Sequence, residues 1–245
     1  MAVEFCTELA GTVFQVTALF EDTKQFCGDY LSRKAPQYAI TVTGSDIDFE
    51  RRKANQEQQK EGLPPAVYSD SYLETLALYR KMAEQLVQED VILMHGAVVA
   101  VDDRAYLFTA KSGTGKTTHI RRWLEAFGSR AVVVNGDKPL LRIKDCGVTV
   151  YGTPWDGKEH LSRNIALPLK AVCILTRSEQ NRIERISKKE AIPMLLQQLH
   201  RPAAPAALAK ALALTDRLGS STALYRLGCN MEPEAALVAY NGMNQ

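Results

Sequence analysis

The residues best suited to chemistry lie in one short stretch, residues 110–118, which reads Ala-Lys-Ser-Gly-Thr-Gly-Lys-Thr-Thr. A strand pattern precedes it at 106–109, and a helix pattern follows it at 119–127. A strand, a glycine-rich loop and a helix in this order predict a phosphate-binding loop. Gly113 and Gly115 let the backbone turn its N–H groups inward, and the start of the helix adds partial positive charge.

The loop residues then have distinct expected roles. Lys116 can reach the outer phosphates of a nucleotide, and the Thr117 hydroxyl can ligate Mg²⁺. The usual pattern begins with glycine, where this chain has Ala110. A glycine-rich turn at a helix start would explain the glycines, but it would not require the Lys-Thr-Thr that follows. We therefore expect nucleotide binding by Ser112, Gly113, Thr114, Gly115, Lys116, Thr117 and Thr118.

Two further residues stand close to this loop in the expected fold. Asp137 follows an apolar strand at 131–134, and open α/β sheets bind ligands at that end of their strands. It could hold Mg²⁺ or accept the proton of an attacking hydroxyl, although Asn-Gly-Asp is also good turn sequence. His95 lies in the strand before the loop, where a single histidine has either a structural or a catalytic role.

The polar, glycine-bearing segment 151–158 is a further candidate. Loops of this kind often carry binding groups on a rigid scaffold. Trp155, expected to be exposed, could stack on a substrate, and Lys158 could neutralise phosphate. The alternative is a surface turn with a half-buried tryptophan.

The remaining pattern predicts the elements that position these groups. The stretch 92–101 is expected as one strand, returning through a turn at 102–104 into a strand at 105–109, so that an antiparallel hairpin leads into the loop. The charged segment 46–62 predicts a solvated helix or a mobile segment, and an amphipathic helix follows from Ser69 or Asp70. Other strands are expected at 10–19, 38–43, 131–134, 139–143, 148–152, 169–176 and 223–228, and other helices at 22–31, 187–199, 203–217 and 232–241.

Composition limits the classes of partner. The 245 residues carry a net charge of +2 with acids and bases interspersed, so no basic stripe predicts a nucleic-acid partner. The five cysteines are scattered without a C-x-x-C pair, which suits a reducing, cytoplasmic compartment. No apolar run is long enough to span a bilayer and the N-terminus lacks a signal-peptide pattern, so no membrane partner is expected.

Together these motifs resemble a known family. The histidine hairpin, the loop S-G-T-G-K-T-T, the strand end N-G-D-K-P and the string G-T-P-W-x-G-K look like the kinase-domain group of HPr serine kinase/phosphorylase and ATP-type phosphoenolpyruvate carboxykinase, above all its small bacterial members. The resemblance covers residues 90–180 most firmly. It implies an α/β fold of the carboxykinase-like P-loop type, a twisted mixed sheet with flanking helices, in a core at 91–245. Residues 1–90 are expected as an N-terminal α/β segment docked on that core.

The resemblance also implies roles for single residues. Lys116 and Thr117 become the triphosphate and Mg²⁺ residues, Asp137 the catalytic base or metal ligand, and His95 the histidine beside the reacting phosphate. Gly136 stands where the family has the first of two adjacent acids, so Gly136→Asp is expected to restore the pair. No convincing copy of the carboxykinase residues for oxaloacetate and manganese is present, so decarboxylation is not expected.

The resulting expectation is a kinase that uses Mg²⁺ and ATP. Its phosphate acceptor would be a hydroxyl group, either of a small molecule or of a peptide or protein serine, with Trp155 and Lys158 facing it. The missing acid at Gly136 keeps a second class open, a nucleotide-binding regulatory or accessory protein whose catalysis is weakened. Pyrophosphate as donor or product is a third alternative.

Overall fold

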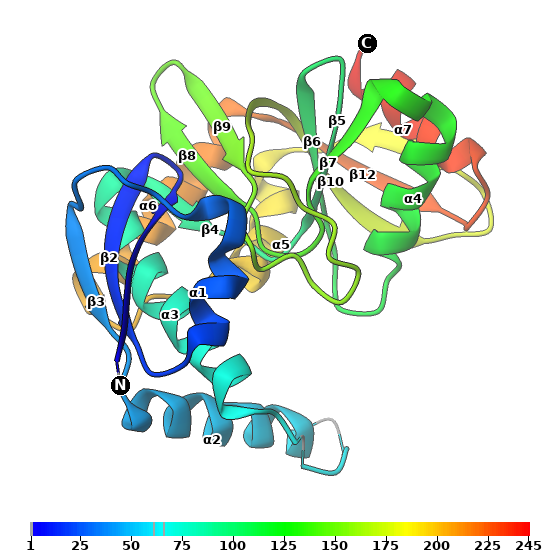
Figure 1. Ribbon diagram of the computed structural model, residues 1–245. Coiled ribbons are helices and arrows are strands. Elements are labelled where there is room, and N and C mark those ends of the chain that lie inside the picture. The colour runs from blue at the N-terminus through cyan, green and yellow to red at the C-terminus, as the bar shows by residue number, and fades with distance from the viewer. Residues whose placement is uncertain (1, 61, 66) are drawn as a thin grey trace. The chain divides into compact units, whose positions relative to one another are not determined.

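The structure is a computed structural model that describes residues 2–60, 62–65 and 67–245. The chain divides between Leu86 and Val87 into two compact units. Figure 1 colours the first from blue to blue-green and the second from there through green to red. None of the helices in the described part of the chain combines the length and apolar character that a membrane span needs.

The N-terminal unit is built on a three-stranded sheet in which β2 is central, antiparallel to β1 and parallel to β3. Side chains of β2 alternate, so Phe14, Val16 and Ala18 are each 0% exposed while Gln15 faces solvent. The helix α3 presents an apolar face with Leu73, Leu78 and Met82 fully buried. The elements are β1 (Val3–Leu9), β2 (Thr12–Ala18), α1 (Glu21–Cys27), the 3₁₀ turn η1 (Gly28–Tyr30), β3 (Tyr38–Thr41), α2 (Gly44–Lys60) and α3 (Asp70–Leu86).

A buried carboxylate on α3 fixes the start of α1. Glu74 is 0% exposed, and its two oxygens accept the backbone N–H groups of Leu19 at 2.5 Å and Phe20 at 3.1 Å, together with the Thr23 hydroxyl. These contacts satisfy free donors at a helix N-terminus, whose partial positive charge also favours an acid. The helix ends at Gly28, where φ is +28°, so it is shorter than the 22–31 expected from sequence.

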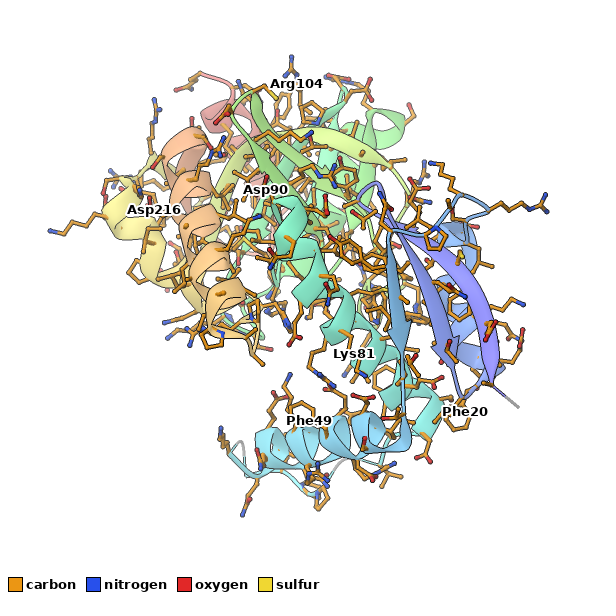
Figure 2. All side chains as sticks on the ribbon, turned by 90° about the vertical axis from the view of Figure 1, so that its left-hand side faces the viewer. Phe20, Phe49, Lys81, Asp90, Arg104 and Asp216 are labelled. Carbon is orange, nitrogen blue, oxygen red and sulfur yellow. The ribbon has the colours of Figure 1, made fainter. Side chains whose placement is uncertain are left out.

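The charged stretch 46–62 is mostly helical, because α2 runs from Gly44 to Lys60. Asp46 in its first turn accepts from Lys81 Nζ at 2.7 Å and from Arg80 Nη2 at 3.4 Å on α3. Burial raises the pKa of Asp46, but hydrogen bonds from Lys81 and Thr43 outweigh it and lower the pKa to about 2. The Arg80 guanidinium also lies 4.6 Å from the ring centroid of Phe49, and Figure 2 labels Phe49 on α2 and Lys81 on α3.

The C-terminal unit contains a nine-stranded mixed sheet, in the order β4-β8-β9-β10-β6-β5-β7, with β12 beside β10 and β11 beside β12. The long strand β10 joins its parts, because its first residues pair antiparallel with β9 and its later ones pair parallel with β6 and β12. The strands are β4 (Val91–Leu93), β5 (Ala97–Val101), β6 (Arg104–Thr109), β7 (Ala131–Asn135), β8 (Leu140–Lys144), β9 (Gly147–Tyr151), β10 (Ala166–Arg177), β11 (Arg182–Arg185) and β12 (Ala223–Cys229).

Helices cover both faces of this sheet (Figure 1). One core cluster joins alternate residues of β5, β6 and β10, such as Val98, Leu107 and Val172, to α5 and α6. The other joins the intervening residues, such as Val99 and Phe108, to α4 and α7. The helices are α4 (Lys116–Phe127), α5 (Lys188–Gln198), α6 (Pro205–Ser221) and α7 (Glu234–Met243), with 3₁₀ turns η2 (Val87–Glu89) and η3 (Gly128–Arg130).

The mixed α/β sheet with flanking helices is confirmed, and so is the antiparallel hairpin of β5 and β6 that leads into the glycine loop. The expectation of one strand over 92–101 is wrong. The chain leaves the sheet at 94–96, because β4 pairs with β8 whereas β5 pairs with β6 and β7. At Gly96 a Cβ would lie 2.8 Å from Leu107 Cδ1 and 3.0 Å from the Phe108 carbonyl oxygen, so a side chain there would require the Leu107 side chain and the neighbouring backbone to shift. Strands β1 and β11 were not expected.

Candidate functional site

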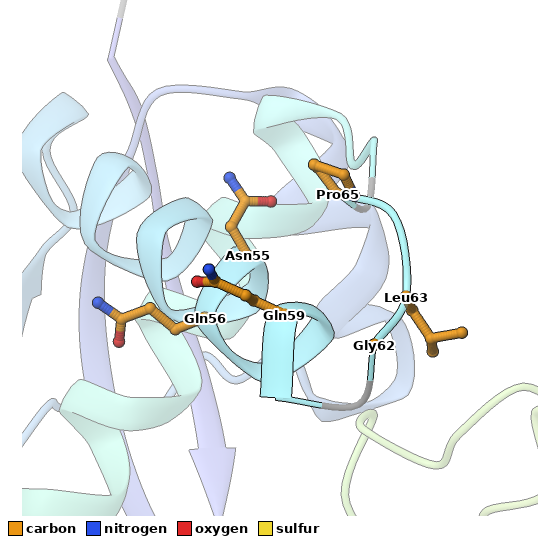
Figure 3. Close-up of a pocket in the computed structure, with 6 residues that line it drawn as sticks. All are labelled: Asn55, Gln56, Gln59, Gly62, Leu63 and Pro65. Carbon is orange, nitrogen blue, oxygen red and sulfur yellow. The ribbon is translucent and has the colours of Figure 1, made fainter.

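Two hollows differ in their chemistry. One, of about 430 Å³ in the N-terminal unit, is lined by Asn55, Gln56, Gln59, Gly62, Leu63 and Pro65, and these described lining residues carry no ionisable group (Figure 3). The other, of about 470 Å³ in the C-terminal unit, is lined by the glycine loop, His95, Asp137, Asp156 and Lys158, among others. Only this second cavity joins a phosphate-binding motif to acid and base groups, so it is the candidate site.

The glycine loop has the backbone that its sequence requires. Gly113 has φ +73° and Gly115 φ +115°, a region that side-chain-bearing residues rarely adopt, and α4 begins directly afterwards at Lys116. Ser112, Gly113, Gly115, Lys116, Thr117 and Thr118 all line the cavity. The start of α4 therefore turns free N–H groups and partial positive charge toward this space. Thr114 does not line it, and its hydroxyl donates to the Lys111 carbonyl at 2.8 Å.

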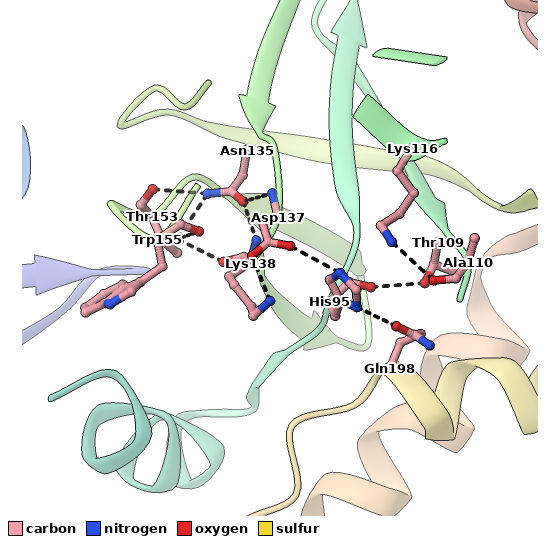
Figure 4. A network of polar contacts seen from close by, with 10 residues as sticks. All are labelled: His95, Thr109, Ala110, Lys116, Asn135, Asp137, Lys138, Thr153, Trp155 and Gln198. Atoms are coloured by element: carbon pink, nitrogen blue, oxygen red, sulfur yellow. Dashed lines mark hydrogen bonds and ion pairs between the residues drawn. The ribbon is translucent and has the colours of Figure 1, made fainter. Parts of the chain in front are cut away.

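Two cations hold the loop in this form. The Lys116 ammonium is nearly buried and donates to the Ala110 carbonyl at 3.2 Å, across the loop from its own helix (Figure 4). Burial lowers the pKa of Lys116, while the Asp137 carboxylate opposes that shift and the neighbouring Lys138 adds to it. On the other side, Arg177 at the end of β10 donates to the Gly113 carbonyl at 2.5 Å. A phosphate ligand would compete with the carbonyl of Ala110 for Lys116.

A side-chain turn positions Asp137 at the end of β7. The buried Asn135 accepts the backbone N–H groups of Asp137 at 2.9 Å and Lys138 at 2.6 Å through Oδ1. Its amide nitrogen donates to the carbonyl and hydroxyl of Thr153, both at 3.0 Å. The turn sequence expected as the alternative to a functional Asp137 is thus present, and it directs the carboxylate at His95 (Figure 4).

The Asp137 carboxylate has a cationic or hydrogen-bonding partner on each oxygen. His95 Nε2 lies 3.2 Å from Oδ1, and Lys138 Nζ lies 2.7 Å from Oδ2. Burial raises the pKa of Asp137, but the hydrogen bond with His95 and the charge of Lys138 outweigh it, and the pKa falls to about 2. At neutral pH Asp137 is therefore a carboxylate, the form that ligates a metal or accepts a proton.

Sequence reasoning missed an acid at this site. A Cβ at Gly136 would lie 2.8 Å from the Asp156 carbonyl oxygen and 3.3 Å from that of Leu161. Gly136→Asp therefore requires the backbone of the turn to shift, and its expected effect on metal binding stays a prediction. Asp156, only 8% exposed, lines the same cavity, and its Oδ1 lies 3.4 Å from His160 Nδ1. The signal for it was its place in the string G-T-P-W-D-G-K.

Of the two remaining residues expected at the site, Lys158 lines the cavity and Trp155 does not. Lys158 is exposed and lines the cavity. The expectation of an exposed Trp155 is wrong, because the residue is 6% exposed, and its ring points away from His95 and Lys116 in Figure 4. Trp155 is not among the cavity-lining residues. Gly152, three residues before Trp155, lies where two parts of the chain approach closely. A Cβ at Gly152 would lie 1.9 Å from the Arg163 carbonyl oxygen.

The donor atoms at the cavity suit Mg²⁺. Thr117 offers a hydroxyl, and Asp137 and Asp156 offer carboxylates, which are the hard oxygen ligands that Mg²⁺ prefers. Within the described residues, no three acidic, histidine or cysteine side chains gather as a ready metal cage.

Comparison with known proteins yields a distant structural likeness. No protein-family model matches the sequence, and no curated protein matches it. Among solved structures, the chain is similar to the HPr(Ser) kinase/phosphatase from Coxiella burnetii. The two share 10% sequence identity over 61% of this chain and 94% of that one, with a TM-score of 0.32.

Proposed function

We propose that the protein is a kinase that binds ATP with Mg²⁺ in this cavity and transfers the γ-phosphate to a hydroxyl group. The observation that carries the proposal is that the glycine loop and the Asp137–His95 pair line one cavity. The loop amides, the start of α4 and Lys116 suit a chain of phosphates. The Asp137 carboxylate, held 3.2 Å from His95 Nε2, supplies a group that can accept a proton at the end of that chain.

The chain's own residues divide the work. Lys116 leaves the Ala110 carbonyl and binds the β- and γ-phosphates, where it stabilises charge together with the loop amides. Asp137 accepts the proton of the acceptor hydroxyl. The oxygen of that hydroxyl forms a bond to the γ-phosphorus, and the bond from the γ-phosphorus to the bridging β–γ oxygen breaks, which releases ADP. His95 orients Asp137 and stands beside the reacting phosphate.

A second acid resolves a conflict in these roles. One carboxylate cannot readily hold a metal and accept a proton at once. With Asp156 on the same cavity, one acid is available for Mg²⁺, together with the Thr117 hydroxyl, and the other for the hydroxyl proton. Bound Mg²⁺ would neutralise the phosphate charge that develops during transfer.

The acceptor class remains as wide as the sequence predicted, a small alcohol or a serine of a peptide or protein. Lys158 is the exposed cation among the described lining residues that is placed to meet an acceptor carrying negative charge. Because the Trp155 ring is buried and directed away, we do not assign it to stacking on the acceptor.

A nucleotide-binding regulatory protein without productive turnover is the second candidate. Gly136, in place of the first family acid, favours it. The presence of Asp156 weighs against it, because the cavity still has a buried carboxylate besides Asp137. Turnover separates the two, since a sensor binds ATP without transferring its phosphate.

Calorimetry of ATP and ADP binding with and without Mg²⁺ tests the proposal first, on the wild type, on Lys116→Ala and on the control Lys144→Ala, whose side chain is exposed at the end of β8. We expect Mg²⁺-dependent binding that only Lys116→Ala weakens. Phosphate transfer is then measured against a panel of polyols, amino acids and serine peptides, and Lys116→Ala should lose about 10²–10³-fold in rate. Absence of nucleotide binding by the wild type would contradict the proposal.

A further inference from the structure

The last residue of α5, Gln198, reaches the candidate site from a part of the chain 103 residues away from His95. Its side-chain Oε1 lies 2.7 Å from His95 Nδ1, and its backbone carbonyl accepts the His95 N–H at 2.8 Å. Figure 4 shows the Gln198 side chain directed at the imidazole ring. One residue therefore holds both the main chain and the ring of His95.

Further hydrogen bonds fix the backbone around His95. The hydroxyl of Thr109, the residue before the glycine loop, donates to the His95 carbonyl at 3.0 Å. The next residue, Gly96, donates its N–H to the Asp137 carbonyl at 2.9 Å. These hydrogen bonds tie the backbone at 95–96 to α5, to the end of β6 and to the Asp137 turn. The rotation of the His95 ring depends on its contact with Asp137 and on a contact with one further side chain.

That contact is with Gln198. The imidazole ring has two nitrogens, and a hydrogen bond at one of them sets the direction in which the other points. With Nδ1 held by Gln198, Nε2 faces Asp137 Oδ1 at 3.2 Å. Each ring nitrogen then faces an oxygen. Without the amide, the half-buried ring could turn about its side-chain bonds and leave Asp137 with Lys138 alone.

We propose that Gln198 is a positioning residue of the catalytic centre, which orients His95 toward Asp137 and through it the carboxylate. This inference rests on the proposed phosphate transfer for its catalytic part, whereas the orientation of the ring does not depend on it. Gln198 touches neither nucleotide nor acceptor in this scheme, so it acts on the transfer step and not on nucleotide affinity.

The adjacent residue supplies a matched control. Gln197 has the same side chain on the same helix turn, but it is exposed, whereas Gln198 is half-buried. Gln198→Leu removes the amide with little change of size, Gln198→Glu keeps an oxygen at the same place, and Gln197→Leu makes the same exchange away from His95.

The experiment records ¹⁵N NMR spectra of the histidine rings, measured at one pH for the wild type and the three variants, and it is readable because the chain has four histidines. We expect changed His95 ring signals in Gln198→Leu, a retained Nδ1 hydrogen bond in Gln198→Glu and wild-type signals in Gln197→Leu. Phosphate transfer should fall about 10- to 100-fold in Gln198→Leu, while ATP affinity by calorimetry stays within about twofold.

Unchanged His95 signals in Gln198→Leu would overturn the inference. Altered signals together with full transfer would overturn its catalytic part, because the ring orientation would then not matter to the reaction. Failure of the proposed function looks different. In that case the wild type shows no transfer to any acceptor, while the NMR comparison still decides whether Gln198 holds the ring.

Discussion

Lys138 Nζ lies 2.7 Å from Asp137 Oδ2, on the carboxylate oxygen that His95 does not use. Each oxygen of Asp137 therefore already has a partner in the absence of ligand. An ammonium at this distance offsets part of the negative charge that draws Mg²⁺ into the cavity, so Lys138 weakens metal binding even where Asp156 and Thr117 hold the metal and Asp137 accepts the proton.

Removing that positive charge should strengthen metal binding. For Lys138→Met, which keeps the length of the side chain without the charge, we expect the Mg²⁺ concentration that half-saturates ADP binding to fall severalfold. Calorimetric titration of ADP at fixed Mg²⁺ levels measures it, with Lys144→Met as the control for a general loss of positive charge. A rise in the required Mg²⁺ would show instead that Lys138 assists the bound complex.

Asp156 should contribute to the same metal. Asp156→Asn keeps the shape of the side chain and removes its charge, so we expect weaker Mg²⁺ dependence of ADP binding while binding without Mg²⁺ is preserved. Electron spin resonance of paramagnetic Mn²⁺, used in place of Mg²⁺, measures metal binding directly. Glu159→Gln, a change at an exposed acid that lines the cavity and pairs with Arg121, is the control. Equal effects of the two variants would point to bulk charge and not to a ligand.

Asp137→Asn should abolish phosphate transfer, because an amide neither accepts the hydroxyl proton nor carries charge. The structure adds an effect on stability, since the carboxylate is the common partner of His95 and Lys138. Its folded pKa of about 2 lies below its ordinary value of 3.8, so its contribution is present above pH 3.8 and is lost as the pH falls toward 2. Urea unfolding of wild type and variant at pH 7 and pH 3 should show a smaller difference at the lower pH.

Gly136→Ala should destabilise the protein without adding any charge. Its Cβ would approach the Asp156 carbonyl to 2.8 Å, and overpacking of this kind typically costs about 1–3 kcal/mol. Gly44→Ala is the control, because a Cβ there meets open space. Chemical denaturation compares the two, and an equal stability for Gly136→Ala and wild type would mean that the turn relaxes readily.

A buried histidine of α4 should make stability fall as the pH is lowered. Trp123 Nε1 donates to His119 Nε2 at 3.0 Å, which requires a lone pair on that nitrogen, and burial lowers the pKa of His119 to about 4. The unfolded chain takes up a proton near pH 6.5 and the folded one only near 4, so this contribution is complete above pH 6.5 and decreases by up to about 3 kcal/mol toward pH 4. His119→Gln keeps an acceptor for Trp123 and should flatten the pH dependence of urea unfolding in this window.

Local patterns predicted most of the secondary structure, because strands such as 131–134 and the amphipathic α3 carry their periodicity in a few neighbouring residues. The break between β4 and β5 at Met94 to Gly96 could not be predicted from such local patterns. Met94 to Val101 is apolar apart from His95 and Gly96, and what divides it is the pairing of β4 and β5 with different strands. The buried Trp155 was missed for the same reason, since a turn sequence does not show what packs against it.

The residues of the candidate site likewise fall into those that adjacent residues predict and those that only the fold brings together. The glycine loop and Asp137 could be predicted, since a dihedral requirement and a strand end leave marks in adjacent residues. Gln198 could not, because its relevance arises from a contact across the fold with His95. The string G-T-P-W-D-G-K marked the segment that carries Asp156, but only the fold shows that this carboxylate lines the cavity.

The close chain crossings at Gly136 and Gly152 have an evolutionary consequence. A side chain at either position would meet a backbone carbonyl, at 2.8 Å and 1.9 Å respectively, and carbonyls cannot be substituted away by a second mutation. These two codons therefore have few neutral alternatives to glycine. In diverging descendants, the two glycines should outlast overall sequence identity as a mark of common ancestry.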